Sequence, residues 1–277
     1  LWAASDSRAR GVLLGATAGR TTLHGEGLQH QDGHSHVLAS VIPACEAYDP
    51  AFAYEMASIV ESGIRRMYGE GEDVFFYLTL YNEPWIQPEK PEGVDQGIID
   101  GLYKFTDGPP GGEHKATILF SGPAHKAARE AQQELLEHFG VSAELWSVTN
   151  YKRLREEALE VERCNRLHPA EDPRTPLVTS QLQETEGPIV AVTDYMRIVP
   201  DQITPFAPRT FLPLGTDGYG RSDTREALRT FFEVDTPNVV VAALTALARD
   251  GEIDVSVVQA AIDRYGIDTE SAPPWTY

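Results

Sequence analysis

Residues 25–36 read GEGLQHQDGHSH and follow the short apolar run GVLLG at residues 11–15. The apolar run predicts a β-strand, and the polar segment predicts a loop beyond its carboxyl end. In open α/β sheets, ligands bind at that end of the strands. Imidazoles exchange protons near neutral pH, and glycines let the backbone approach a ligand closely. We therefore expect the chemistry of this chain to centre on residues 25–36, which we call the histidine loop.

Strands and helices alternate along the rest of the sequence, which predicts an α/β fold. In the first part we expect strands at 11–15, 38–42 and 74–80 and a helix over 50–67 that starts at Pro50 with Asp49 as its cap. In the second part we expect strands at 116–120, 143–148, 189–193 and 210–214 and helices at 124–139, 150–163, 224–234, 237–249 and 255–265. Gly140 and Gly266 are expected to end two of these helices, and Thr236 and Asp254 to cap the starts of two others.

A segment rich in proline, asparagine and glutamate at residues 82–93 predicts a linker between two domains. We place the domains at 1–92 and 93–277. The second contains enough strands and helices for a complete doubly wound unit. The first has three expected strands and one helix, which cannot cover both faces of a parallel sheet, so we expect the chain to begin inside a domain.

Composition excludes several classes of protein. The 277 residues include 42 Asp plus Glu against 23 Lys plus Arg, a formal net charge of −19, which opposes binding to nucleic acid and to anionic membranes. Cys45 and Cys164 lack the spacing of a disulfide framework or a cysteine zinc site. The apolar stretch 239–248 is too short to span a bilayer, and the N-terminus does not resemble a signal peptide. These features predict a soluble, cytoplasmic protein.

Several short sequence motifs dispersed along the chain resemble those of a known family. They are GATAGRTTL at 15–23, the histidine loop, YDPAFAYE at 48–55, RMYGE at 66–70, LHP at 167–169, TDYM at 193–196 and LGTDGYGRSDTRE at 214–226. Together they resemble the homodimeric, bacterial type of pyruvate dehydrogenase E1 component, a thiamine diphosphate enzyme related to transketolase. The resemblance covers nearly the whole chain, to about Ile267.

The resemblance implies a fold and an activity. Residues 1–92 would be the second half of a pyrimidine-binding domain, and 93–277 a complete transketolase-like C-terminal domain. The full enzyme would decarboxylate pyruvate with thiamine diphosphate and Mg²⁺ and transfer the acetyl group to the lipoyl group of the E2 dihydrolipoyl acetyltransferase. We expect the cofactor and metal ligands to lie outside this chain, which would be an artificial truncation, a proteolytic fragment or one piece of a split protein. Alone it should be inactive.

The resemblance also assigns candidate site residues. His30, in the word GLQH, would lie close to the reacting carbon and hydrogen-bond an oxygen of pyruvate, and Gln29 would join it in binding the substrate. Glu26, which we assign with His30 to the catalytic residues, would orient His30 or join a carboxylate network that couples paired active sites. Alternatively, Glu26 would be solvated. We expect His34 and His36 to shape the loop through hydrogen bonds, and His24 to be peripheral.

Other interpretations remain open from the residues alone. His24, His30, His34 and His36 could form a metal site, although their spacing supports this weakly and no cysteine accompanies them. Residues 215–222, GTDGYGRS, resemble a phosphate-binding loop before a helix capped by Ser222 or Asp223, but a tight turn with capping explains them better. Rival functions are a transketolase-like enzyme for another substrate and a non-catalytic interaction or dimerisation module.

Overall fold

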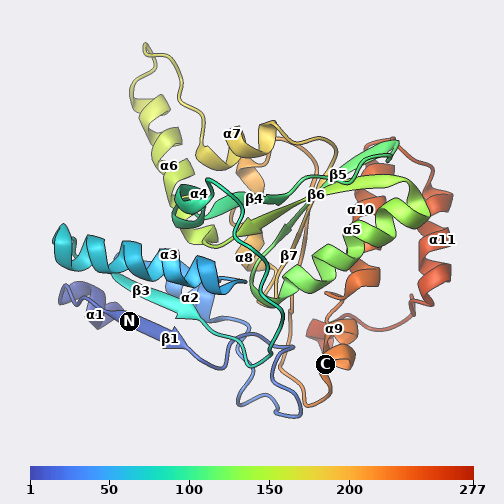
Figure 1. The fold of residues 1–277 in the computed structure, drawn as a ribbon, viewed down its shortest axis with the longest axis horizontal. Helices are drawn as coiled ribbons and strands as arrows, with labels where there is room; N and C mark the ends of the chain where they lie inside the picture. Colours follow the sequence, from blue (N-terminus) through green and yellow to red (C-terminus); the bar gives the residue numbers. More distant parts are fainter.

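The computed structural model describes all residues of the chain, 1–277, as two β-sheets flanked by helices (Figure 1). The first sheet is parallel and has the order β1-β3-β2. Its strands are β1 Val12–Gly15, β2 Cys45–Tyr48 and β3 Phe75–Thr79. Helix α3, Ala53–Ile64, continues into a π-helical turn at Arg65–Gly69, and packs on one face of this sheet.

One expected strand is wrong. Residues expected as a strand at 38–42 belong to helix α2, Ser35–Ser40, and the turn after it, and the strand lies further on, at β2. Asp32 Oδ1 accepts the backbone N–H groups of His34 and Ser35 at 3.1 and 2.9 Å, which favours the start of a helix there. Ala39 and Ile42, three residues apart, then pack together beneath the sheet. A short apolar run is compatible with both the helical and the strand period of hydrophobic residues. Here the Asp32 contacts favour the helix. Helix α1, Trp2–Asp6, was also not predicted.

The second sheet has the order β4-β6-β5-β7-β8, with β4 antiparallel to β6 and the other pairs parallel. The strands are β4 Leu102–Thr106, β5 His114–Phe120, β6 Val141–Val148, β7 Ile189–Val192 and β8 Phe211–Leu214. The helices are α4 Asp95–Asp100, α5 His125–Phe139, α6 Tyr151–Leu167, α7 Leu177–Gln183, α8 Ile198–Asp201, α9 Arg225–Phe231, α10 Thr236–Arg249 and α11 Val255–Tyr265. The doubly wound prediction is confirmed, although α4, β4, α7 and α8 were not foreseen. The domain boundary at residue 92 stays a prediction.

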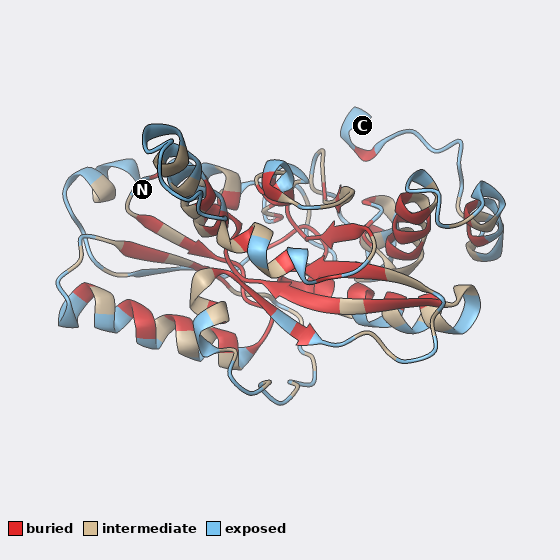
Figure 2. Cartoon of the chain, turned by 90° about the horizontal axis from the view of Figure 1, so that it is seen from above, coloured by how far each residue is buried: buried red, intermediate tan, exposed pale blue.

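Alternate residues of the central strands face opposite layers. Ile118 and Phe120 pack with α5 and α10, whereas Leu119 between them packs with α6 and α7. Figure 2 shows the resulting buried strands between two helical layers, with the outer helices and the C-terminal tail mostly exposed. Both layers therefore depend on near-continuous apolar strands, as expected for a parallel sheet.

Helix ends test the expected caps. Gly140 and Gly266 are left-handed C-caps and Asp254 caps α11, as predicted. Asp235, and not Thr236, caps α10. Helix α3 starts at Ala53 after Phe52, so the expectation that Asp49 caps it is wrong. Pro50 lies before the helix, and the Asp49 carboxylate is engaged elsewhere.

The carboxyl ends of the two sheets face each other across a buried polar seam. Asp49, just after β2, accepts hydrogen bonds from Thr79 Oγ1 at 2.7 Å, from Tyr81 and from Ser121 Oγ at 2.7 Å. Fully buried Glu55 in α3 accepts from Tyr103 and Ser147 of the second sheet, each at 2.6 Å. These two carboxyl groups join the sheets through three hydroxyl groups of the second unit, those of Ser121, Tyr103 and Ser147.

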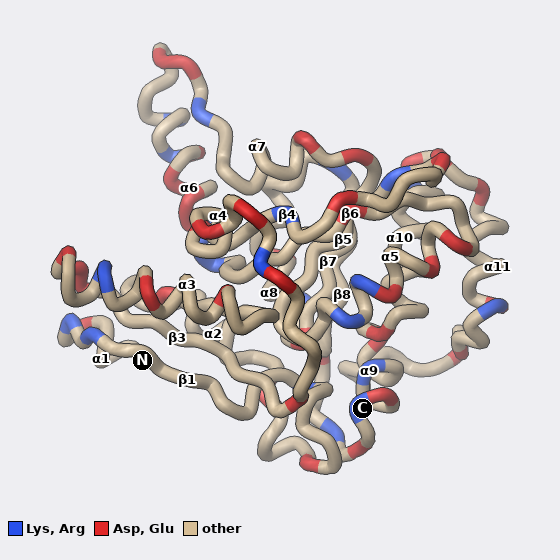
Figure 3. Tube along the Cα trace, in the orientation of Figure 1, with Lys and Arg blue, Asp and Glu red and all other residues tan.

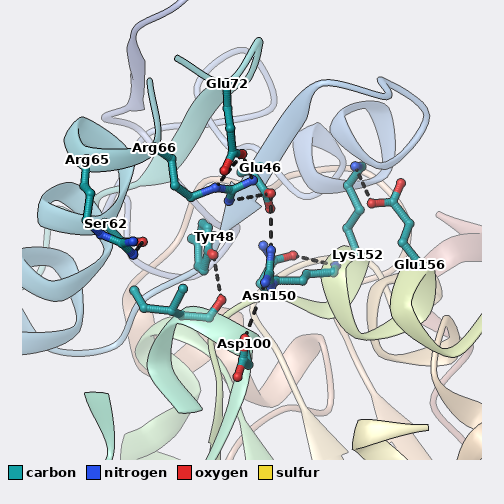
Figure 4. A network of polar contacts seen from close by, with 12 residues as sticks. Glu46, Tyr48, Ser62, Arg65, Arg66, Glu72, Asp100, Asn150, Lys152 and Glu156 are labelled. Carbon is teal, nitrogen blue, oxygen red and sulfur yellow. Dashed lines mark hydrogen bonds and ion pairs between the residues drawn. The ribbon is translucent and has the colours of Figure 1, made fainter. Parts of the chain in front are cut away.

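An ionic network lies at the margin of this seam (Figure 4). Glu46 of β2 contacts Arg66 at 2.7 Å and Arg153 of α6 at 3.4 Å. Arg66 also pairs with Glu72 at 2.7 Å, and Arg153 with Asp100 at 3.4 Å. The network therefore ties the first sheet to helices α4 and α6 of the second unit.

Surface charge follows the composition. Acidic side chains are scattered over both units and are not gathered on one element (Figure 3). By length and composition alone, residues 225–249 are apolar enough to cross a membrane. Half of the most apolar part is buried in the fold, and α9 ends at Phe231 before α10 begins at Thr236. The stretch is therefore explained as core packing.

Candidate functional site

The histidine loop follows β1 and brings Glu26 and His30 together. Glu26 Oε2 lies 2.9 Å from His30 Nδ1, and the two side chains are about half exposed, at 47% and 51%. The His30 backbone N–H donates to Gly27 O at 3.0 Å, which closes a turn between them. Glu26 therefore lies beside His30 and is also partly solvated, and its role stays a prediction. His30 Nε2 makes no hydrogen bond within the chain.

Gln29 is exposed, like most of the loop's tip. Its amide oxygen lies beside Gly27, where an added Cβ would come within 3.1 Å. His24 is exposed as well. The candidate binding side chains therefore project from the rim of the fold and are not held in a closed cavity.

The other histidines have different surroundings. His36 is buried, its ring meets Tyr195 edge-on at 4.6 Å between centroids, and Tyr77 lies 5.6 Å away. Burial lowers the pKa of His36, so the ring is neutral. His34 is exposed and gives its backbone N–H to Asp32. His36 thus shapes the loop by packing, while its Nε2 lacks the hydrogen bond we expected.

Arg20 forms the buried base of the loop. Its guanidinium donates to the Thr216 carbonyl and fills the space beside Gly33, where no Cβ would fit. Burial lowers the pKa of Arg20, while the nearby carboxylates of Asp217, Asp32 and Asp194 oppose that shift. The backbone before the loop is thereby fixed to the second domain.

Residues 215–225 of the second domain contact the loop directly. Helix α9 after them is capped by Thr224 Oγ1, which accepts from Ala227 N at 3.2 Å, so the expected caps Ser222 and Asp223 are wrong. Ser222 Oγ instead donates to Gly25 O at 2.9 Å. The capping and tight-turn interpretation of this segment holds in outline, with contacts to the histidine loop that the sequence did not reveal.

The usual ligand crevice of the second domain is filled. In a doubly wound sheet it lies where the chain reverses its direction across the sheet, here between the carboxyl ends of β5 and β7. Thr21 occupies this place, its N–H donating to Asp194 Oδ2 at 3.2 Å. A cavity of about 10 Å³ remains beside Asp194 and Arg229, space for a single water at most. The second domain therefore uses its ligand edge to dock the first.

Metal binding has no support in the geometry. No group of three or more His, Cys, Asp or Glu side chains is placed to hold a metal ion. The four-histidine interpretation is therefore wrong, because buried His36 and exposed His30 do not converge.

Comparison with known proteins decides the family. Residues 1–88 match the family model of the pyruvate dehydrogenase E1 component middle domain, and residues 101–235 match that of the transketolase-like TK C-terminal domain. The chain is 53% identical to the pyruvate dehydrogenase E1 component of Mycolicibacterium smegmatis over 100% of its length, and 47% identical to that of Escherichia coli K12 over 99%. The chain belongs to the pyruvate dehydrogenase E1 family. It spans about 30% of the length of these relatives.

Solved structures support the fold of this E1 chain. A transketolase from Leishmania mexicana superposes with a TM-score of 0.62 at 16% identity, covering 89% of this chain and 31% of that one. A structure described as "split gene transketolase, inactive beta4 tetramer" gives a TM-score of 0.54 at 18% identity, covering 86% and 66%. At such identities the likeness establishes the transketolase-like α/β architecture alone.

Sequence reasoning missed the residues that hold the E1 loop in place. Gln31 and Arg20 are buried polar residues with partners far away in sequence. The only sequence feature that could have indicated them is their position inside the glycine-rich motifs at residues 15–23 and 25–36. Partners in the other domain cannot be read from local spacing.

Proposed function

We propose that this chain supplies the substrate-side loop of a pyruvate dehydrogenase E1 component. The enzyme would decarboxylate pyruvate and transfer the acetyl group to the lipoyl group of E2. The observation that carries the proposal is the Glu26–His30 pair, 2.9 Å apart on a loop beyond a strand's carboxyl end, in a chain about half identical to proteins named as E1 components. His30, Gln29 and Glu26 are the residues we assign to the site.

The pair suits proton chemistry at an oxygen atom. Glu26 Oε2 lies 2.9 Å from His30 Nδ1, and a carboxylate at this place favours the proton on that nitrogen in the neutral ring. In the neutral ring, Nε2 of His30 then carries the free lone pair and can accept a hydrogen bond. In the protonated ring, Nε2 carries a proton and can donate one. His30 can thus donate to or accept from an oxygen of a 2-oxo acid, and Gln29 can add an amide hydrogen bond.

Transketolase-like E1 enzymes depend on thiamine diphosphate. No group of three or more His, Cys, Asp or Glu side chains is placed to hold a metal ion in this chain. We propose that the cofactor and metal are held by residues of the longer enzyme outside this chain.

The surface of residues 1–90 supports assembly with further protein. β1 is an edge strand, and its Leu13 and Leu14 are 43% and 57% exposed. Trp2, Leu38, Val41, Ile64 and Tyr68 are also exposed, each by more than half. Large apolar side chains in such numbers on one unit indicate an interface. We propose that a second subunit or the rest of the domain covers them, as in a homodimer, with the E2 lipoyl domain as a further partner in the cytoplasm.

The decisive experiment compares the chain with the longer enzyme. The enzyme containing this chain, given thiamine diphosphate, Mg²⁺ and pyruvate, should release CO₂ and acetylate a lipoyl domain, whereas the 277-residue chain alone should do neither. A solved relative in fold is described as an inactive tetramer, which supports the second expectation. Ketol transfer between sugar phosphates by the longer enzyme, without pyruvate decarboxylation, would favour the transketolase-like alternative. No turnover of either substrate would favour an interaction module.

A further inference from the structure

The glycine-rich segment 215–225 has no part in the proposed reaction, yet it holds the histidine loop at several points. Gly25 N donates to Asp223 O at 2.9 Å, and Ser222 Oγ donates to Gly25 O at 2.9 Å. Arg225 Nε donates to Thr22 O at 2.9 Å, just before the loop. One of these bonds joins two backbone groups, and in the other two a side chain of the segment donates to a backbone carbonyl at or just before the loop. Together these contacts fix the backbone path of the histidine loop.

Gln31 lies at the centre of these contacts between the histidine loop and residues 215–225. It is 5% exposed, and its Oε1 accepts the backbone N–H of Arg221 at 2.7 Å, 190 positions away. Its Nε2 donates to Leu23 O at 3.4 Å, back across the loop. Gln31 is the chain neighbour of His30. A shift of Gln31 would therefore move the backbone that carries the candidate catalytic imidazole.

Gly220 shows how closely the two segments approach. A Cβ built there would lie 2.8 Å from Gln31 Cβ and 3.3 Å from Leu28 Cα. Its φ is not in the left-handed region, so the backbone itself would accept alanine. The absence of a side chain at position 220 is therefore required by the loop and not by the turn.

The cations of the segment are already engaged by protein groups. Arg225 also donates to Asn82 O at 2.9 Å, and the Arg221 guanidinium lies 4.3 Å from the Phe231 ring centroid. Helix α9 has only seven residues. A phosphate ligand would have to displace these contacts, so the segment's resemblance to a phosphate loop does not indicate anion binding.

We propose that residues 215–225 act as a clamp through which the second domain positions His30, with Gln31 and Gly220 as positioning residues. The catalytic consequence rests on the proposed function, whereas the clamp itself rests only on the contacts. Losing the Gln31 acceptor would remove the partner of the Arg221 N–H and release the loop from the segment. His30 would then sample positions from which it cannot serve the reaction, because catalytic geometry tolerates little displacement.

The test compares Gln31→Met, which keeps the length of the side chain, with Gln31→Glu, which restores an oxygen acceptor for Arg221 N–H. Exposed Gln133→Met in α5 is the matched control. Hydrogen–deuterium exchange of residues 25–33 is measured in the 277-residue chain, with thermal midpoints to confirm folding. We expect Gln31→Met to speed exchange there by about tenfold or more, and the control to stay near the wild type. Gln31→Glu should lie between them, because it keeps the acceptor for Arg221 N–H but loses the donor to Leu23 O. Gly220→Ala should act like Gln31→Met, and Gly11→Ala, whose Cβ would meet nothing within 4 Å, should not.

The kinetic arm uses the longer enzyme. Gln31→Met should lower kcat by about tenfold with a smaller change in KM, and it should add little in a His30→Ala background, because both changes remove the same interaction. Unchanged loop exchange in Gln31→Met and Gly220→Ala would overturn the clamp. Faster exchange with an unchanged kcat, or losses that multiply in the double variant, would overturn the positioning role. An enzyme that does not decarboxylate pyruvate refutes the proposed function, and loop exchange still decides the clamp.

Discussion

Asp49 Oδ2 accepts a hydrogen bond from Ser121 Oγ at 2.7 Å, although the two residues lie 72 positions apart and follow strands of different sheets. Ser121 in turn lies 3.0 Å from Thr193 Oγ1. The carboxyl ends of β2, β5 and β7 therefore meet at one point. This meeting closes the usual ligand edge of the second domain and leaves the histidine loop at the rim of the junction.

The first prediction concerns this junction. Asp49→Ala leaves the hydroxyls of Thr79, Tyr81 and Ser121 without their acceptor in a buried place. We expect the free energy of unfolding to fall by about 3 kcal/mol or more, since hydrogen bonds to a charged group are among the strong ones. Urea unfolding of the chain measures it, with exposed Asp172→Ala as control. A loss below about 1 kcal/mol would show that the seam does not hold the sheets together.

The second prediction concerns Asp194. Burial raises the pKa of Asp194 to about 7, while an aspartate in an unfolded chain titrates near pH 4. Between these values only the folded state keeps the proton, so this group's contribution to stability falls as pH rises from about 4 to about 7, by up to about 1.4 kcal/mol per pH unit. The difference in urea midpoint between wild type and Asp194→Asn should therefore change across this range and level off above it. A constant difference would contradict the assignment.

The third prediction has the opposite sign. His125 is buried among Phe52, Trp85 and Phe120, and neither ring nitrogen has a partner. Burial lowers the pKa of His125 to about 3, against about 6.5 for an unfolded chain. The unfolded state alone binds a proton between these values, so stability is lost as pH falls from about 6.5 towards 3. His125→Phe should reduce the acid-induced drop in urea midpoint, and His168→Phe on the surface should leave it unchanged.

The fourth prediction concerns the exposed apolar surface of the first unit. If it forms an interface, the 277-residue chain should self-associate at micromolar concentration in light scattering. Leu14→Glu on the edge strand should shift the chain towards the monomer, because a charge would be buried in the contact. Val255→Glu, 72% exposed at the start of α11, is the control. A monodisperse wild-type monomer with this face solvated would count against the interface.

Much of this fold could be predicted because its main elements carry local signals. The apolar strands β5 and β7, the periodic helix α5 and its Gly140 cap need no distant partner to be recognised. The failures are local ambiguities that a tertiary or capping contact decides. Asp32 accepts the backbone N–H groups just before and at the start of helix α2, and the antiparallel edge strand β4 pairs with β6.

The candidate site also contains residues that could be predicted from the sequence and residues that could not. The family resemblance suggested that Glu26 could orient His30, and the structure places the two side chains 2.9 Å apart. By contrast, Asp49 looked like a helix cap because a proline follows it, and its true partners come from strands that the sequence does not place beside it. Gln31 offered no signal beyond its place in the histidine loop, since its partner lies 190 positions away.

The last prediction separates the histidines by their surroundings. In the longer enzyme, His30→Ala should lower turnover by about 10- to 10³-fold, the range for losing one positioned acid–base or hydrogen-bonding group, with little change in fold or cofactor affinity. His36→Ala should instead lower the thermal midpoint, because the ring is buried against Tyr195. Exposed His34→Ala should change activity only through loop order. Steady-state kinetics and thermal melts of the three variants test this together. Full activity in His30→Ala, with activity abolished in a folded His34→Ala enzyme, would move the catalytic role to His34 and leave the family assignment intact.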